Sequence, residues 1–267
     1  MSKTKTDMTM TLVPETEPRP NVLVVRLGRG RTGGSTALDW IIQRARSQGR
    51  DVLIGDGDSR NPTLAGYYPP GGKGGANQPA SDETADVKDW ITARLSESAM
   101  RGVSLVLDLG GGDRVLAEYG RDLALVDFCE SAGIIPLALY FSGPEMDDFE
   151  HIHTIHETGY FRPQRGILVF NENLVPQGRT TMGAFEPILA RPELARMVGD
   201  GMEIVFMPRL PCMMEMRRAG LSFFDAAANK PGADGKPLDP VRQFMIKSWN
   251  DRLEAAFAKA GASSWLP

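Results

Sequence analysis

The feature that most constrains the fold is a series of short apolar segments that alternate with amphipathic helical patterns. The segments predicted as strands are 21–25, 51–54, 103–107, 134–141, 166–170 and 203–207. Residues 103–107 are apolar at nearly every position, as expected of a strand that is buried on both faces. Strands that alternate with helices form βαβ units. The sequence therefore predicts a doubly wound α/β fold with a mostly parallel sheet and helices on both faces.

The helical patterns and the polar segments set the expected domain organisation. Helices are expected at or around 35–45, 87–95, 123–128, 146–156, 182–198 and 240–260, where apolar residues recur at helical spacing. Residues 66–84 are rich in glycine and proline and are expected to form a long loop without a regular element. Residues 1–20 read as a flexible tail and 263–267 as a short C-terminal tail. Residues 21–262 are expected to form a single domain.

Composition excludes several functional classes. The 267 residues include 30 basic and 34 acidic side chains, a net charge of −4, so the chain has no global basic field for nucleic acid. Two cysteines, Cys129 and Cys212, are too few for a disulfide framework or a cysteine metal site. The sequence shows no signal-peptide core and no run of roughly 18 apolar residues. We expect a soluble cytoplasmic protein without a membrane anchor.

The first strand and the first helix are separated by a glycine-rich segment, Gly28-Arg-Gly-Arg-Thr-Gly-Gly-Ser-Thr36. We call residues 28–36 the glycine loop. Glycines let the backbone approach a phosphate, and the following helix N-terminus supplies amide donors and a favourable dipole. A loop in this context predicts phosphate binding. It matches a dinucleotide fingerprint, with Asp56 as the ribose-binding acid, and equally a Walker A loop whose lysine is replaced by Gly34.

The other strand ends favour the second interpretation. Asp56 and Asp58 follow the second strand, Asp108 closes the third and precedes glycines, and Asn171 closes a later one. An aspartate that ends an apolar strand and is followed by glycines is typical of the Walker B arrangement, which holds Mg²⁺. A dinucleotide-binding fold needs no acid at that position. The last strand is followed by the turn 208–211, Pro-Arg-Leu-Pro.

These motifs resemble those of the deviant-Walker-A ATPases of the ParA/MinD type, a branch of the P-loop NTPases. The family loop KGGxGK[ST][ST] aligns with residues 29–36, and the order of elements matches over 21–225. The resemblance implies binding of ATP and Mg²⁺, with roles for residues of the glycine loop and of four strand ends. The phosphates would lie against Gly28, Gly30, Arg31, Thr32, Gly33, Gly34, Ser35 and Thr36. The metal shell would include Ser35, Asp56 and Asp108, and Asn171, Pro208 and Pro211 would lie near adenine. Asp58 would orient the attacking water, and Arg29 would reach the partner subunit.

Three loop positions depart from the family pattern. Gly34 replaces the lysine that contacts the terminal phosphates, Arg29 replaces the signature lysine, and Arg31 occupies a glycine position. Arginine can pair with phosphate in a bidentate manner. Loss of a charged transition-state contact costs about a hundredfold in rate, so the resemblance implies slow or lost hydrolysis. A lysine introduced at position 34 is then expected to raise ATP affinity or turnover.

Two further clusters carry weaker signals. His151, His153 and His156 fall in one segment, but their spacing does not place all three on one helix face, and surface histidines are expected. Arg209, Arg217 and Arg218 form a local basic cluster, which reads either as a solvated face or as a non-specific contact to DNA. Residues 212–216, with one cysteine and three methionines, are expected to pack in a core or an interface.

Three functional hypotheses follow. The first is a homodimeric ATP–Mg²⁺ switch that positions cargo, such as a plasmid, a chromosome region, or a secretion or conjugation machine, through a protein partner or cargo adaptor. The second is a pseudo-ATPase scaffold of the same fold, whose loop binds nucleotide weakly or not at all. The third is an NAD(P)-dependent oxidoreductase, which depends on the glycine fingerprint and on Asp56.

Overall fold

The computed structural model describes residues 20–110 and 113–267. Its strands are β1 (Asn21–Leu27), β2 (Val52–Asp56), β3 (Ala76–Asn77), β4 (Ser104–Asp108), β5 (Ile134–Ser142), β6 (Arg165–Asn171) and β7 (Met202–Met207). They form one sheet in the order β3-β2-β4-β1-β5-β6-β7, and every strand pairing among the described residues is parallel. The predicted doubly wound α/β fold is confirmed.

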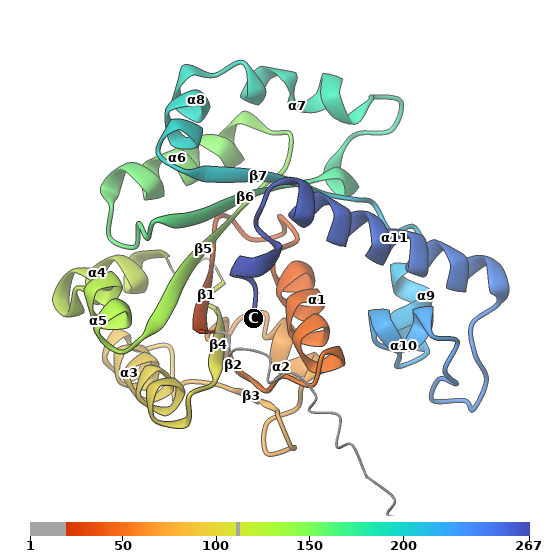
Figure 1. Ribbon diagram of the computed structural model, residues 1–267, viewed down its shortest axis with the longest axis horizontal. Coiled ribbons are helices and arrows are strands. Elements are labelled where there is room, and N and C mark those ends of the chain that lie inside the picture. Colours follow the sequence, from red (N-terminus) through yellow and green to blue (C-terminus); the bar gives the residue numbers. More distant parts are fainter. Residues whose placement is uncertain (1–19, 111–112) are drawn as a thin grey trace, which may run out of the picture.

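The helices form two layers around this sheet. They are α1 (Gly34–Ser47), α2 (Thr63–Tyr67), α3 (Thr84–Arg101), α4 (Asp113–Leu123), α5 (Leu125–Ser131), α6 (Met146–Thr158), α7 (Thr181–Leu189), α8 (Pro192–Gly199), α9 (Met213–Arg218), α10 (Phe223–Ala227) and α11 (Pro240–Lys259), with 3₁₀ turns η1 (Glu172–Leu174) and η2 (Ser263–Trp265). One core cluster joins the sheet to α1, α2 and α9–α11, and the other joins it to α3–α8 (Figure 1). None of the described helices is long and apolar enough to cross a membrane.

The alternation of side chains along β1 decides which residue faces the glycine loop. Val22 and Val24 pack in the cluster on the α1 side, whereas Leu23 and Val25 pack in the opposite cluster. Successive side chains of a strand point to opposite faces. Arg26 therefore emerges on the α1 side, at the end of the strand where the glycine loop and the N-terminus of α1 lie.

The structure corrects several expected elements. Segment 66–84 is not without regular structure, because Ala76–Asn77 pairs with β2; a two-residue strand shows no sequence periodicity. The single helix expected over 182–198 is two helices, since Pro192 disfavours helical backbone at Arg191. Ala124 adopts a left-handed backbone between α4 and α5, which interrupts the helix expected there.

Of the two expected tails, only the C-terminal one lies entirely within the described residues. Residues 1–19 of the predicted N-terminal tail lie outside the described residues, as do Gly111 and Gly112 after β4. Segment 263–267 forms η2 and buries Leu266 in the core cluster on the α1 side. The C-terminal segment thus packs against the domain instead of extending from it.

Candidate functional site

The strand order brings the glycine loop beside Asp108. β4 lies directly next to β1, with Arg26 in register with Asp108, and β2 lies one strand further out. A dinucleotide fingerprint requires the ribose-binding acid on a strand that neighbours β1, as in both common doubly wound orders. Asp56, at the end of β2, does not meet this requirement because β4 intervenes. The topology therefore removes the structural basis of the oxidoreductase hypothesis.

Ser35 and Asp108 form the centre of the site. The Ser35 hydroxyl, in the first turn of α1, donates a hydrogen bond of 2.5 Å to Asp108 Oδ2. The other carboxylate oxygen, Oδ1, accepts a 3.0 Å bond from the Gly110 amide, and the Asp108 side chain is buried. A hydroxyl at the start of the helix that follows the loop and a carboxylate at the end of a neighbouring strand are the protein groups that hold Mg²⁺ beside a nucleotide. The residues present fit that cation.

Such a site takes its remaining ligands from water and phosphate. Within 20–110 and 113–267, no group of three or more His, Cys, Asp or Glu side chains is arranged to hold a metal ion without such ligands.

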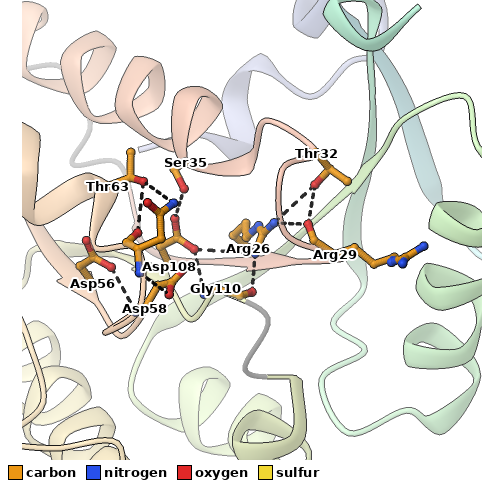
Figure 2. Close-up of polar contacts among 10 residues, drawn as sticks. Arg26, Arg29, Thr32, Ser35, Asp56, Asp58, Thr63, Asp108 and Gly110 are labelled. Atoms are coloured by element: carbon orange, nitrogen blue, oxygen red, sulfur yellow. Dashed lines mark hydrogen bonds and ion pairs between the residues drawn. The ribbon is translucent and has the colours of Figure 1, made fainter.

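Asp58 and Asp56 point in different directions. The Asp58 carboxylate faces the end of β4, where a Cβ added to Gly110 would lie 2.6 Å from Asp58 Oδ2. Asp56 instead accepts amide hydrogen bonds from Ala65 in α2 (2.8 Å) and from Asp58 (3.2 Å). Asp58 thus lies on the Asp108 side of the site (Figure 2), whereas the observed contacts of Asp56 are with the backbone. Its expected place in the metal shell stays a prediction.

Burial raises the pKa of Asp56 to about 6 from its ordinary value of 3.8, and the neighbouring Asp108 charge contributes to the increase. The folded protein therefore binds this proton more tightly than the unfolded chain. In metal-free buffer, the contribution of Asp56 to the free energy of unfolding should fall by about 3 kcal/mol as the pH rises from about 4 to above 6. Urea unfolding across this range should show a steeper fall for wild type than for Asp56→Asn. Equal slopes would contradict the raised pKa, and Asp51→Asn, exposed just before β2, is the control.

The backbone of the glycine loop is held in an unusual shape. Gly28, Arg31 and Gly33 adopt positive φ values of 117°, 66° and 92°. At Gly28 the close approach also matters, because a Cβ would lie 2.9 Å from the carbonyl oxygen of Phe141. Asn171 Nδ2 donates a 2.9 Å hydrogen bond to the Thr32 carbonyl, which ties the loop to β6. The loop is therefore preformed, with Asn171 as its anchor.

A cavity of about 160 Å³ lies next to the loop. Its lining includes Arg31, Gly33, Thr36, Asn171, Asn173, Leu174, Met207, Pro208, Leu210, Met213 and Trp249. Of the two prolines predicted to lie near a base, Pro208 lines this cavity, whereas Pro211 is exposed and does not line it. Apolar side chains suit the face of a planar base, and the amides of Asn171 and Asn173 suit its edge.

Arg29 lies away from the Ser35–Asp108 pair. Its side chain is 48% exposed and lies 3.7 Å from an Asp147 oxygen and 3.6 Å from an Asp148 oxygen, both in the first turn of α6. Ion pairs this exposed contribute little to stability. Arg29 and Gly30 border an open cavity of about 620 Å³ beside α6.

Arg26 is the site residue that the sequence analysis did not identify. Its side chain is 4% exposed and donates hydrogen bonds to the carbonyl oxygens of Gly110 and Arg29, and a longer one of 3.4 Å to Thr32 Oγ1. Figure 2 shows the guanidinium between Asp108 and the Thr32–Arg29 part of the loop. The available signal was a lone charge in the apolar run VLVVRL.

The structure corrects part of what was expected of the histidine cluster, the basic cluster and residues 212–216. His156 is buried rather than on the surface, and burial lowers its pKa. Arg217 pairs with the buried Asp39 and stacks 4.0 Å from the centre of the Tyr67 ring, so it is not free for DNA. Of residues 212–216, Cys212 and Met216 are buried as expected, whereas Met214 is 63% exposed.

The structure thus defines a parallel α/β protein with a glycine loop and a hydroxyl–carboxylate pair at one end of its sheet. No protein-family model matches the sequence, and no curated protein matches it. Solved structures with a related fold include chloroplast FtsY from Physcomitrella patens, with 11% identity over 91% of this chain and 68% of that chain (TM-score 0.45). Another is MinD from Aquifex aeolicus, with 13% identity over 85% of this chain and 95% of the MinD chain (TM-score 0.45).

The signal recognition particle receptor FtsY from Elizabethkingia anophelis, in complex with GDP, shares 14% identity over 66% of this chain (TM-score 0.39). The chain spans 54% of that protein.

Proposed function

We propose that this chain is a nucleotide-binding switch protein that binds ATP with Mg²⁺ at the glycine loop. The observation that carries the proposal is the 2.5 Å hydrogen bond between Ser35 and Asp108, which joins the first turn of α1 to the end of β4. The Ser35 hydroxyl oxygen would ligate Mg²⁺ and keep its proton, Asp108 would hold the cation through water, and the cation would bring the nucleotide phosphates to the loop. Asp58, on the same side of the site, would orient the attacking water.

The cavity beside the loop supports adenine over guanine. No Asp or Glu is among the residues described as lining it. Guanine presents two adjacent N–H donors that a carboxylate would accept, whereas adenine presents one amino donor beside an acceptor. The Asn171 amide, with a free N–H and a free lone pair beyond its bonds to Thr32 and Asn173, suits the adenine edge. Its backbone contacts would hold it ready for that role.

The switch would act through a second copy of the chain and a cargo. By its resemblance to the ParA/MinD family, the nucleotide-bound form would be a homodimer in which Arg29 reaches the partner subunit. Arg29 is exposed, and its two weak ion pairs with α6 would break at little cost. A protein partner or cargo adaptor would read the dimer, and the cargo would be a plasmid, a chromosome region, or a secretion or conjugation machine. Any DNA contact would come from the exposed Arg209 and Arg218.

A second candidate, the pseudo-ATPase scaffold, is favoured by one observation. The Arg26 side chain already occupies the inside of the loop and bonds to the Arg29 carbonyl. A loop filled in this way would need no phosphate to be stable. In that case the protein would act by binding a partner through its surface, without a nucleotide.

Titration calorimetry on the whole chain, with sedimentation of the same samples, separates these candidates. We expect ATP to bind in the presence of Mg²⁺ with a shift from monomer to dimer, GTP to bind more weakly, and NADH not to bind. No heat with any nucleotide would reject the switch and favour the scaffold. Binding of NADH alone would restore the oxidoreductase.

A further inference from the structure

The most unusual side chain of this fold is a buried arginine in its central strand. Arg26 is 4% exposed, and its neighbours in the sheet are Asp108 on β4 and Leu139 on β5. Burial of a guanidinium is costly unless its charge is balanced and its donors are bonded. The acceptors and negative charges around the Arg26 guanidinium therefore indicate which kind of ligand the glycine loop would bind.

The charge of Arg26 is only partly balanced. The hydrogen bonds of its terminal nitrogens go to uncharged acceptors: two backbone carbonyls and the Thr32 hydroxyl. The one ion pair described for it, with Asp108, is at 4.0 Å. Its Nε atom is buried and has no hydrogen-bond partner in the described structure. A buried, unbonded N–H on a cation inside a preformed loop indicates a missing anion.

Gly34 is matched to this arginine. A Cβ at position 34 would overlap Arg26 Nε and would lie 2.8 Å from Cγ and 3.0 Å from Cδ. Position 34 can therefore carry no side chain while Arg26 is in place. The positive charge inside the loop thus comes from Arg26 on β1. The space that it needs is available because position 34, at the start of α1, is a glycine.

We propose that Arg26 is the phosphate-binding cation of the glycine loop and contacts the terminal phosphates of the nucleotide in the role left open by Gly34. This inference rests on the proposed function. Arginine offers a fork of donors that matches phosphate oxygens, and the unbonded Nε lies on the Gly34 side of the fork. The contacts with Arg29 and Thr32 would hold the guanidinium in place before the phosphates arrive.

The test compares ligands with the same base and fewer phosphates. ATP, ADP and AMP are titrated with Mg²⁺ into wild type, Arg26→Met and Arg26→Lys. Arg26→Met should lose about ten- to a hundredfold in affinity for ATP and ADP and less than about threefold for AMP, because only the terminal contact is removed. Arg26→Lys keeps the charge and should lose less. Arg44→Met is the control, since Arg44 is also buried but pairs with Glu254 on α11.

Three outcomes would overturn the proposal. If Arg26→Met binds ATP as tightly as wild type or more tightly, Arg26 is a structural group that fills the loop. If ATP and AMP affinity fall in parallel, its effect is not on terminal phosphates. If wild type binds none of the three ligands, the proposed function itself fails, which is distinct from the first two results.

A measurement on wild type covers the case in which Arg26→Met does not fold. The Nε–H of a buried arginine gives its own signal in ¹H–¹⁵N spectra, assigned by its loss in Arg26→Lys. The signal should shift when ADP or ATP is added and stay in place with AMP. An unmoved signal at saturating ATP would reject the assignment of Arg26 to phosphate.

Discussion

Asp108→Asn is expected to invert the effect of Mg²⁺ on nucleotide affinity. In wild type, Asp108 accepts the Ser35 hydroxyl hydrogen bond and would share the cation with it. Without the carboxylate charge, ATP affinity in Mg²⁺ should fall about ten- to a hundredfold, as for loss of a bond to a charged group. Without Mg²⁺, the same change removes an anion from beside the phosphates, and affinity should rise about two- to tenfold.

Calorimetry in Mg²⁺ and in EDTA measures both effects on one protein. Asparagine keeps an oxygen that can accept the Gly110 amide hydrogen bond, so the local backbone should be preserved. Asp51→Asn makes the same chemical change at the opposite, amino end of β2 and should alter neither affinity. If Asp108→Asn keeps the Mg²⁺ dependence of wild type, Asp108 does not hold the cation.

Gly34→Lys is expected to destabilise the fold and to weaken nucleotide binding. From sequence alone, the substitution restores a missing lysine and should raise ATP affinity or turnover. In the structure, the new Cβ would collide with the side chain of Arg26, which is held by Gly110 and Arg29. Overpacking of this kind costs about 1–3 kcal/mol of stability, and two cations in one loop repel each other.

The double variant Arg26→Met/Gly34→Lys should recover much of this loss. With the arginine removed, the lysine has space, and we expect a favourable coupling of about 1–2 kcal/mol between the two sites in urea unfolding. Gly30→Lys is the matched control, because no atom lies within 4 Å of its Cβ position, and it should change stability by less than about 0.5 kcal/mol. A Gly34→Lys protein as stable as wild type and with tighter ATP binding would show that Arg26 does not fill this space.

The fold could be predicted because the strands are apolar and the helices amphipathic. The six predicted strands at 21–25, 51–54, 103–107, 134–141, 166–170 and 203–207 all match strands of the structure to within a few residues. The short elements were missed: β3, α2, α9 and α10 span between two and six residues, too few for a periodic pattern. Strand order was also beyond the sequence pattern, because it depends on crossovers between distant segments.

The residues of the candidate site could be predicted only where the residue type and its local motif together indicate its role. The glycine loop pointed to Ser35 and a strand end to Asp108, and the structure brings these two together. Asp56 ends its strand in the same way, but its carboxylate bonds to the backbone of α2, which no local pattern foretells. Arg26 was missed because its meaning depends on the space left at Gly34, eight positions along the chain and adjacent only in three dimensions.

Amide hydrogen exchange of wild type, with and without ATP and Mg²⁺, tests most directly whether the glycine loop is the nucleotide site. Peptides that cover 28–36 should become protected, together with those at the ends of β2 and β4. Peptides at the opposite, amino ends of these strands should exchange as before. Unchanged exchange over 28–36 at saturating ATP and Mg²⁺, or protection confined to another part of the chain, would contradict this assignment.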